Sequence, residues 1–261
     1  MVSCPFGAIS DKSQIFQLAR ALSEGEEIVA EVAPAFVGQF GSNINVRNFK
    51  AALEELGFSE TYEVALGADI GAIAEAHHYV NKVTTGELPF LLTSCCPSWA
   101  MLAKKFFPDL IDQISQELTP MVATARTIKQ EHPNAKVVFI GPCAAKKLEA
   151  MRRTVRSEVD FVLTFEEMSG IFAAKDLDLE NMHEDADGVN DVSTDGRNFA
   201  VSGGVAQAVV DVIKKEYPDK EIKIANAEGL EECRKLMMLA SKGKYNGYLL
   251  EGMACPGGCV A

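Results

Sequence analysis

Long apolar runs are missing from this sequence, and none approaches the ~20 consecutive apolar residues that a membrane helix needs. The N-terminus also lacks a basic region followed by an apolar one, which is the mark of a secretory signal peptide. These two absences argue against a membrane partner and against secretion. We therefore expect a cytoplasmic protein.

Basic residues are the scarcer charged class. The chain has 25 Lys and Arg against 37 Asp and Glu, which gives a formal net charge of −12. Proteins that bind nucleic acid need a basic surface to neutralise phosphates. The charge balance therefore argues against a nucleic-acid partner, and it leaves proteins and small molecules as candidate partners.

Pairs of Cys-x2-Cys motifs are absent too, although the sequence has seven cysteines. A cytosolic chain of 261 residues does not need disulfides. Most of the cysteines lie in three short segments rich in Gly and Pro, which favours metal ligation in a reducing compartment. The alternative, a buried thiol acting as a small apolar side chain, suits Cys233 in its helical pattern. Cys4 has no partner cysteine nearby, and we expect it to be inert.

Strand patterns alternate with helical patterns along the whole chain, without an internal repeat or a flexible linker. This alternation predicts an α/β fold of mainly parallel sheets with right-handed crossovers. Residues 176–198 are acidic and rich in turn formers, and we expect them to form an exposed excursion. The expected strands are 27–32, 61–66, 89–92, 136–140, 159–163, 221–225 and 245–250, and the expected helices are 15–22, 45–56, 70–83, 97–107, 120–131, 144–155, 165–173, 203–217 and 230–241.

The three cysteine segments each follow an expected strand. In parallel sheets, ligand sites lie beyond the carboxyl ends of the strands, so distant segments can meet there. We therefore expect two lobes, each a sheet flanked by helices, with a metal site in the cleft between them. The expected lobes are roughly 12–135 and 136–261.

Five thiols of these segments are candidate ligands. Four thiolates hold a cubane 4Fe-4S cluster, and zinc also accepts four thiolates. Two glycines inside the last segment suit a larger group that the backbone approaches closely. Thiolate chemistry thus favours an iron–sulfur site and leaves zinc as the alternative. The candidates are Cys95, Cys96, Cys143, Cys255 and Cys259.

The three segments together resemble the signatures of the iron-only (FeFe) hydrogenases, in the large-subunit catalytic domain. Residues 93–99 (TSCCPSW) resemble the first signature, residues 141–149 (GPCAAKKLE) the second, and residues 251–259 (EGMACPGGC) the third. The likeness extends over nearly the whole chain. Smaller matches fill the intervals, at residues 33–35, 67–69, 199 and 202–205.

This resemblance implies an H-cluster. Such a cofactor is a 4Fe-4S cubane joined through a cysteine sulfur to a two-iron unit that carries carbon monoxide, cyanide and a dithiolate bridge. Cys95 is then an unligated thiol that passes protons to the bridging amine of the two-iron unit, and Cys259 also bridges the two parts. The implied cubane ligands are Cys96, Cys143, Cys255 and Cys259.

The same resemblance implies that further residues lie beside the cofactor. Lys146 is expected to meet a cyanide ligand, because an ammonium offers a compact charge and three donors. On sequence alone, a solvated lysine on a basic helix is the alternative for Lys146. The other positions expected to line the cofactor are Ala33, Pro34, Ala35, Gly141, Phe199 and Met253.

A proton relay of Glu75 and Ser115 is implied by their offsets from Cys95. The next relay position, a Glu in well-known members of the family, is His78 here. Histidine can relay protons near neutral pH. A solvated helix face is the alternative for His77 and His78.

Two departures from the family pattern concern the surroundings of the cofactor. Gly141 stands where the second signature usually has Met, and Met121 stands where a Gln is expected. We expect a loosened wall at Gly141 and a lost amide at Met121, and hence altered turnover, because such neighbours tune a metal centre. These changes resemble the sensory branch of the family.

The sequence therefore predicts an oxidoreductase, a hydrogenase that interconverts protons plus electrons and dihydrogen, with a low-turnover hydrogen sensor as a variant. An iron–sulfur assembly protein of the Nar type, with the cubane and without the two-iron unit, is the alternative. The implied partners are a ferredoxin-like electron carrier or a signalling domain, and hydrogenase maturation proteins. Residues 1–11 resemble the stub of a ferredoxin-like module, residues 12–261 form the hydrogenase domain, and we expect a truncation after residue 261.

Overall fold

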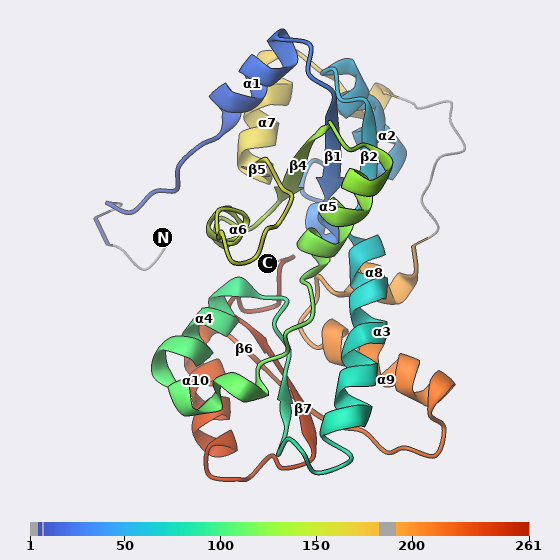
Figure 1. Cartoon of the computed structure of the whole chain (residues 1–261). Coiled ribbons are helices and arrows are strands. Elements are labelled where there is room, and N and C mark those ends of the chain that lie inside the picture. The colour runs from blue at the N-terminus through green and yellow to red at the C-terminus, as the bar shows by residue number, and fades with distance from the viewer. Residues whose placement is uncertain (1–4, 7, 183–191, 261) are drawn as a thin grey trace.

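A computed structural model describes residues 5–6, 8–182 and 192–260 of the chain (Figure 1). Cys4, which the sequence predicts to be inert, lies outside these residues. The described chain contains two parallel sheets, one in each of two lobes, as expected. No helix among the described residues combines the length and the apolar character needed to cross a bilayer.

The first sheet has four parallel strands in the order β2-β1-β4-β5. Its central strands are mostly apolar, rich in β-branched residues and buried on both faces, with Glu31 as the one charged residue inside β1. Helices therefore cover both faces: α1, α2 and α7 on one and α5 on the other. The strands are β1 (Ile28–Val32), β2 (Glu60–Glu63), β4 (Lys136–Gly141) and β5 (Phe161–Thr164).

The second sheet has three parallel strands in the order β3-β7-β6. Leu92 and Leu250 face α4 and α10, while Leu91 and Leu249 face α3 and α9, so this sheet is also covered on both faces. The strands are β3 (Leu91–Leu92), β6 (Lys223–Glu228) and β7 (Tyr248–Met253).

The helices fill the connections between these strands. Helix α3 joins the lobes, since Leu66 near its start packs beside Val29 of the first sheet and Val80 near its end packs beside the second sheet. The helices are α1 (Ile15–Ser23), α2 (Val46–Glu55), α3 (Ala65–Lys82), α4 (Pro97–Phe106), α5 (Pro120–Glu131), α6 (Ala145–Ala150), α7 (Phe165–Ala174), α8 (Thr194–Asn198), α9 (Gly204–Glu216) and α10 (Leu230–Ala240), with short 3-10 turns η1 (Pro34–Phe36), η2 (Pro108–Gln113) and η3 (Leu179–Asn181).

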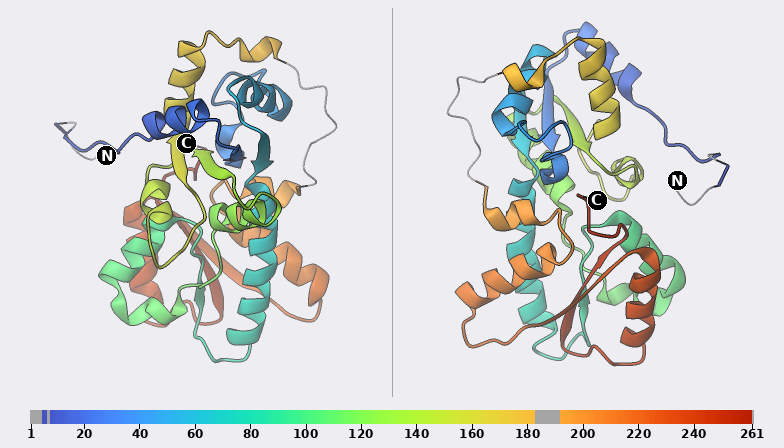
Figure 2. Two further views of the ribbon diagram at one scale, coloured as in Figure 1. Left: turned by 45° about the horizontal axis from the view of Figure 1, so that its top comes forward. Right: turned by 180° about the vertical axis from the view of Figure 1, so that it is seen from behind.

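The chain crosses between the lobes more than once, so the expected boundary near residue 135 does not separate the two sheets. β3 lies before that boundary but pairs with β7, and β4 and β5 lie after it but join β1 and β2. Strands that are neighbours in a sheet can therefore lie far apart in the sequence, as β3 and β7 do. Figure 2 shows the segment after β7, at the red end of the colour scale, entering the space between the two sheets.

Several element boundaries differ from the sequence prediction, and β2, expected at 61–66, is observed at Glu60–Glu63. Helix α6 ends at Ala150 and not at residue 155, and the chain beyond it forms turns in which the Arg152 N–H donates to the Glu149 carbonyl oxygen and the Val155 N–H to that of Arg152. Helix α3 begins at Ala65, five residues before the predicted start. The last two strands are displaced toward the C-terminus, since their pairing runs on to Glu228 and Met253. In the predicted excursion, residues 183–191 lie outside the described residues.

His132 forms an ion-paired cluster at the amino ends of β1 and β2. Its Nδ1 lies 2.8 Å from Glu27 and its Nε2 lies 2.9 Å from Glu60. The hydrogen bond with Glu27 raises the pKa of His132, against the opposing effect of burial, and Glu60 adds to the rise. The folded protein therefore holds this proton more tightly than the unfolded chain does.

We predict that His132→Gln lowers the free energy of unfolding by about 1 kcal/mol below pH ~6.5, where unfolded histidine is also protonated. The difference from wild type should vanish as the pH rises through the raised pKa of His132. Denaturant unfolding at pH 5.5 and pH 9 measures both values. His77→Gln, which removes a histidine paired with Glu216 in the other lobe, is the matched control. Equal destabilisation of His132→Gln at both pH values would contradict the prediction.

Candidate metal and cofactor site

The carboxyl ends of both sheets face one cavity of about 730 Å³. Segments that follow β1 and β4 of the first sheet line it, together with segments that follow β3 and β7 of the second. The structure therefore brings together all five candidate thiols from distant parts of the sequence. The predicted residues that line this cavity are Ala33, Pro34, Ala35, Cys95, Cys96, Cys143, Lys146, Phe199, Met253, Cys255 and Cys259.

Local chemistry holds the first cysteine segment at a strand-to-helix turn. Cys96 is the extended residue before α4, and Pro97 takes the first helical position, where its missing N–H has no cost. Trp99 is fully buried, and its Nε1 donates a hydrogen bond of 3.0 Å to the Thr93 carbonyl oxygen. The indole thus ties the start of α4 back to the end of the strand.

The last cysteine segment turns sharply at Gly258. This residue has φ = 91°, and a Cβ there would lie 2.6 Å from the Ala200 carbonyl oxygen. The Cys259 N–H donates to the same carbonyl over 2.7 Å. Only glycine combines this backbone angle with such a close approach. The turn thus brings Cys259 beside Ala200, in the segment that precedes α9.

The described cysteines are all free thiols, and they differ in exposure. Cys255 is exposed, Cys233 is buried, and the other four are partly buried. Burial raises the pKa of Cys259 to about 12, and the thiols of Cys143, Cys96 and Cys255 contribute to the rise. Burial, followed by Cys143 and Cys96, also raises the pKa of Cys255. These mutual effects indicate that the four sulfurs share one space.

The donor set fits a cluster better than a single ion. Among the described residues, no three Cys, His, Asp or Glu side chains come close enough to bind one metal ion. A tetrahedral zinc site needs four donors at one centre, whereas the four irons of a cubane each take their own thiolate. Four thiols that line one large cavity are compatible with a cubane.

Lys146 is buried beside the thiols. Its Nζ lies 2.6 Å from Glu149 Oε2 and donates over 3.3 Å to the Cys95 carbonyl oxygen. Burial lowers the pKa of Lys146, but Glu149 and the thiols of Cys143 and Cys95 raise it, and the net shift is upward. The alternative of a solvated lysine is wrong, because only 11% of this side chain is exposed. The ammonium supplies positive charge within the cavity.

Cys95 lines the large cavity and also a second one of about 10 Å³, the volume that holds one water molecule. Glu75, Thr93 and Phe199 line this small cavity with it. Glu75 Oε1 and Thr93 Oγ1 are buried without a hydrogen-bond partner. Burial, Glu251 and Cys96 raise the pKa of Cys95 well above its usual range, so the group is a thiol at neutral pH.

Glu75 and Ser115 form a buried pair, with Ser115 Oγ 3.0 Å from Glu75 Oε2. Burial raises the pKa of Glu75 to about 8, although the hydrogen bond with Ser115 opposes this. Glu75 is therefore a neutral acid near pH 7. Glu75 lines the small cavity, and Ser115 lies next to it outside that lining.

Glu117 extends this line of polar groups outward, and sequence reasoning missed it. Its N–H donates to Ser115 Oγ over 3.2 Å, and its Oε1 lies 3.6 Å from His78 Nδ1. The His78 side chain is 18% exposed, so the solvated-face alternative does not describe it. His77 instead pairs with Glu216 on the surface. The signal for Glu117 was its position two residues after Ser115.

Gly141 does not line the cavity, and the expectation of a loosened wall there is wrong. The ring of Phe139 occupies the space beside it, with Cε1 2.6 Å from the position of a Cβ at residue 141. Phe139 lines the cavity instead. Met121, the other departure, is fully buried and also lines the cavity.

Glu31 is a second buried acid that sequence reasoning missed. It is fully buried in β1, and neither carboxyl oxygen has a hydrogen-bond partner. Burial raises its pKa well above the usual range, against the opposing effect of Lys146. One charged residue within the apolar run Ile28–Val32 was the available signal.

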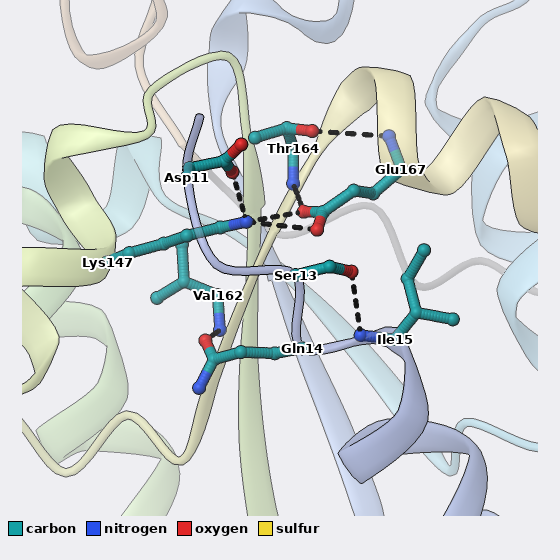
Figure 3. A network of polar contacts seen from close by, with 8 residues as sticks. All are labelled: Asp11, Ser13, Gln14, Ile15, Lys147, Val162, Thr164 and Glu167. Atoms are coloured by element: carbon teal, nitrogen blue, oxygen red, sulfur yellow. Dashed lines mark hydrogen bonds and ion pairs between the residues drawn. The ribbon is translucent and has the colours of Figure 1, made fainter. Parts of the chain in front are cut away.

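The N-terminal segment is tied to the helix that follows Cys143 (Figure 3). Lys147 Nζ lies 2.9 Å from Glu167 Oε2 and also pairs with Asp11. Gln14 Oε1 accepts a hydrogen bond of 2.8 Å from the Val162 N–H at the edge of the first sheet. Asp11 itself lines the large cavity, so this network places the N-terminal segment at its mouth.

Comparison with known proteins identifies related chains. A family profile described as iron only hydrogenase large subunit, C-terminal domain, matches residues 26–261. The NADP-reducing hydrogenase subunit HndD of Solidesulfovibrio fructosivorans is 28% identical over 312 residues, which cover 98% of this chain and 53% of HndD. The chain thus spans about half the length of this relative.

Two further likenesses bear on function. The cytosolic Fe-S cluster assembly factor NAR1 of Kluyveromyces lactis is 26% identical over 172 residues, which cover 62% of this chain and 36% of NAR1. A solved [FeFe]-hydrogenase, described in terms of oxygen inactivation of the 2Fe subcluster of its H cluster, has a TM-score of 0.78 and 20% identity, covering 96% of this chain and 84% of that one. The structural likeness shows a common fold.

We predict that Glu75→Gln stabilises the protein at pH 7 by a few kcal/mol. The folded pKa of Glu75, about 8, lies above its unfolded value of about 4.5, so wild-type stability falls as the pH rises from 4.5 to 8. The amide does not ionise, so the advantage of Glu75→Gln should grow over this range and then level off. Denaturant unfolding at pH 5, 7 and 9 measures it.

The control for this experiment is Glu117→Gln, whose side chain is 35% exposed and is not sealed from solvent. It should change stability little and without the same rise between pH 5 and 8. A Glu75→Gln protein that is less stable than wild type at pH 7 and at pH 5 alike would show that the carboxyl is ionised in the fold.

Proposed function

The chain belongs to the family of the iron-only hydrogenase large subunit, C-terminal domain, and on this premise we propose that it is a hydrogenase catalytic domain that interconverts protons plus electrons and dihydrogen. The observation that carries the proposal is the position of Cys95. This thiol lies between the large cavity, with its four other thiols, and the small cavity beside the buried acid Glu75. A metal site and a proton route thus meet at one side chain.

The cofactor of this proposal is a 4Fe-4S cubane joined to a two-iron unit with carbon monoxide, cyanide and a dithiolate bridge. The neighbouring [FeFe]-hydrogenase structure is described with an H cluster that has a 2Fe subcluster, and the donor set of this chain is compatible with such a group. When bound, the cofactor supplies the redox chemistry of hydrogen. The cubane ligands that we propose are Cys96, Cys143, Cys255 and Cys259.

Lys146 and the apolar wall provide the surroundings that such a cofactor needs. A buried ammonium favours an anionic ligand such as cyanide, because the low-dielectric interior weakens its charge less than water does. Ala33, Pro34 and Ala35 offer only small apolar groups on one side, and Phe199 and Met253 lie on the others. The proposed cofactor pocket therefore combines the Lys146 ammonium with a largely apolar wall.

The proton route that we propose runs from His78 and Glu117 at the surface through Ser115 and Glu75 to Cys95. The side chains of all five residues can give and take a proton, although Glu117 contacts Ser115 through its backbone N–H and not through its carboxylate. Glu75 carries a proton at pH 7, since its pKa is about 8. The small cavity between Glu75 and Cys95 has room for one water molecule to complete the path.

An assembly factor of the Nar type is the second candidate function, and the similarity to NAR1 favours it. Such a protein would hold the cubane without the two-iron unit. A buried route of proton-carrying groups that ends at an unligated thiol has no use there. A low-turnover hydrogen sensor is a variant of the first proposal, with the same cofactor and a signalling partner in place of an electron carrier. We propose a ferredoxin-like carrier or such a signalling domain as partner, and maturation proteins as the source of the two-iron unit.

Iron content and an infrared spectrum of the purified protein, produced together with hydrogenase maturation proteins, test the proposed function. The proposal expects the iron of a cubane plus a two-iron unit, and the bands of carbon monoxide and cyanide ligands. Iron of the cubane alone, without these bands, would favour the assembly factor. Full bands with little hydrogen turnover would favour the sensor.

We predict that Cys143→Ser loses most of the bound iron, because three thiolates hold a cubane poorly. Iron analysis of the purified variant measures it. Cys233→Ser is the matched control: Cys233 is buried and contacts the Ala227 and Met253 carbonyl oxygens, which a hydroxyl can also do. The control should keep its iron. Unchanged iron in Cys143→Ser would remove Cys143 from the ligand set.

We predict that Cys95→Ala keeps the iron and the infrared bands but loses hydrogen turnover by a factor of ~100 to ~10,000, the usual contribution of an acid–base group. Cys96→Ala, the neighbouring control, should lose the cluster. Turnover, iron and infrared spectra of both variants decide the roles. If the two outcomes are exchanged, the ligand and the proton carrier have been assigned to the wrong neighbours. Normal turnover in Cys95→Ala would mean that protons take another route.

A further inference from the structure

Phe139 and Gly141 share one face of β4, because side chains two residues apart in a strand point the same way. The Phe139 ring leans along the strand toward its carboxyl end. Its far edge lies where a side chain at residue 141 would begin: a Cβ there would meet Cε1 at 2.6 Å and Cζ at 2.7 Å. Real Cβ atoms do not approach a ring carbon so closely, so any other side chain at this position requires the ring to move.

The neighbouring strand closes the same space from the side. The Cβ of Ala33, just after β1, lies 3.0 Å from the same hypothetical Cβ. Phe139 is 3% exposed and belongs to the main core of the first lobe, yet it also lines the large cavity. One ring therefore connects the packed interior of the sheet with the cavity wall beside Pro142 and Cys143.

We propose that Phe139 forms the cavity wall at the second cysteine segment and limits the space open to a ligand of the bound cofactor there. Positions 139 and 141 then act as an exchangeable pair, in which a large side chain at one requires glycine at the other. The part that concerns the ligand rests on the proposed function. The exchange of side-chain volume between positions 139 and 141 does not rest on the proposed function, because it follows from the packing of this chain alone.

A double-mutant cycle tests the exchange on the protein as purified, without any cofactor loading. Gly141→Met should lower the midpoint of thermal unfolding by about 5 °C in the wild-type background, because the side chain is forced into the ring. Phe139→Ala should lower it by about 10 °C, because it leaves a cavity. In the Phe139→Ala background the sign should reverse: Gly141→Met should raise the midpoint, since it fills the space that the ring left. Gly141→Ala, a smaller change, gives the same comparison if Gly141→Met does not fold.

Two controls separate this exchange from general effects. Phe172→Ala removes a buried ring of the same core cluster away from residue 141, so Gly141→Met should remain destabilising in that background. Gly170 in α7 has no atom within 4 Å of a built Cβ, so Gly170→Met should not lower the midpoint. If Gly141→Met lowers the midpoint of thermal unfolding equally in the wild-type, Phe139→Ala and Phe172→Ala backgrounds, the proposed exchange between positions 139 and 141 is wrong.

The infrared spectrum of protein matured with the two-iron unit tests the ligand part. Phe139→Ala should shift the carbon monoxide or cyanide bands, whereas Phe172→Ala should not. Bands at identical positions in Phe139→Ala and wild type would overturn the role of the ring as a limit on ligand space. A wild-type protein that shows no such bands would refute the proposed function, and the unfolding cycle would still decide the exchange between Phe139 and Gly141.

Discussion

The parallel pairing of β3 with β7 is the interaction on which the site depends. It sets Leu92 beside Leu250, and the two chain segments that continue from these strands carry Cys96 on one side and Cys255 with Cys259 on the other. The pairing of β1 with β4 does the same in the other lobe for Ala33 and Cys143. The carboxyl ends of the strands in both sheets point toward one cavity. Ligands of parallel sheets bind at this place, beyond the ends of the strands.

Burial and neighbouring charges together set the protonation states of the titratable groups around this cavity. Lys146 keeps its proton because Glu149 lies beside it, and Glu75 keeps its proton because desolvation outweighs the help of Ser115. Glu31 is also protonated more readily than in water, with no partner for its oxygens. A chain with a net charge of −12 thus carries two buried lysines, Lys146 and Lys147, and the buried acids Glu75 and Glu31 around its thiols. Such an arrangement suits an anionic cofactor and a route for protons.

Much of the fold could be predicted, because short, mostly apolar segments rich in β-branched residues, such as Ile28–Val32 and the one that ends at Gly141, favour buried strands. Element ends were less predictable. The helix after Cys143 ends at Ala150, whose carbonyl oxygen accepts a hydrogen bond from Ser157 Oγ, and no local pattern in the sequence reveals that contact. The division at residue 135 failed to separate the sheets because strand pairing joins segments from both halves. Glu117 was missed because its contact with Ser115 is made through its backbone N–H.

The sequence by itself determined the alternation of strands and helices, the positions of the cysteine segments at strand ends, and the family to which their motifs belong, since each of these is a property of residues close together in the chain. Only the tertiary structure decided which thiols share a cavity, that Lys146 is buried, and that Phe139 fills the place beside Gly141. The first two depend on residues that come from different strands and turns, and the third depends on how the Phe139 ring lies along its own strand. They depend on how the two sheets pack, because close packing lets one ring occupy a space only where another side chain is missing.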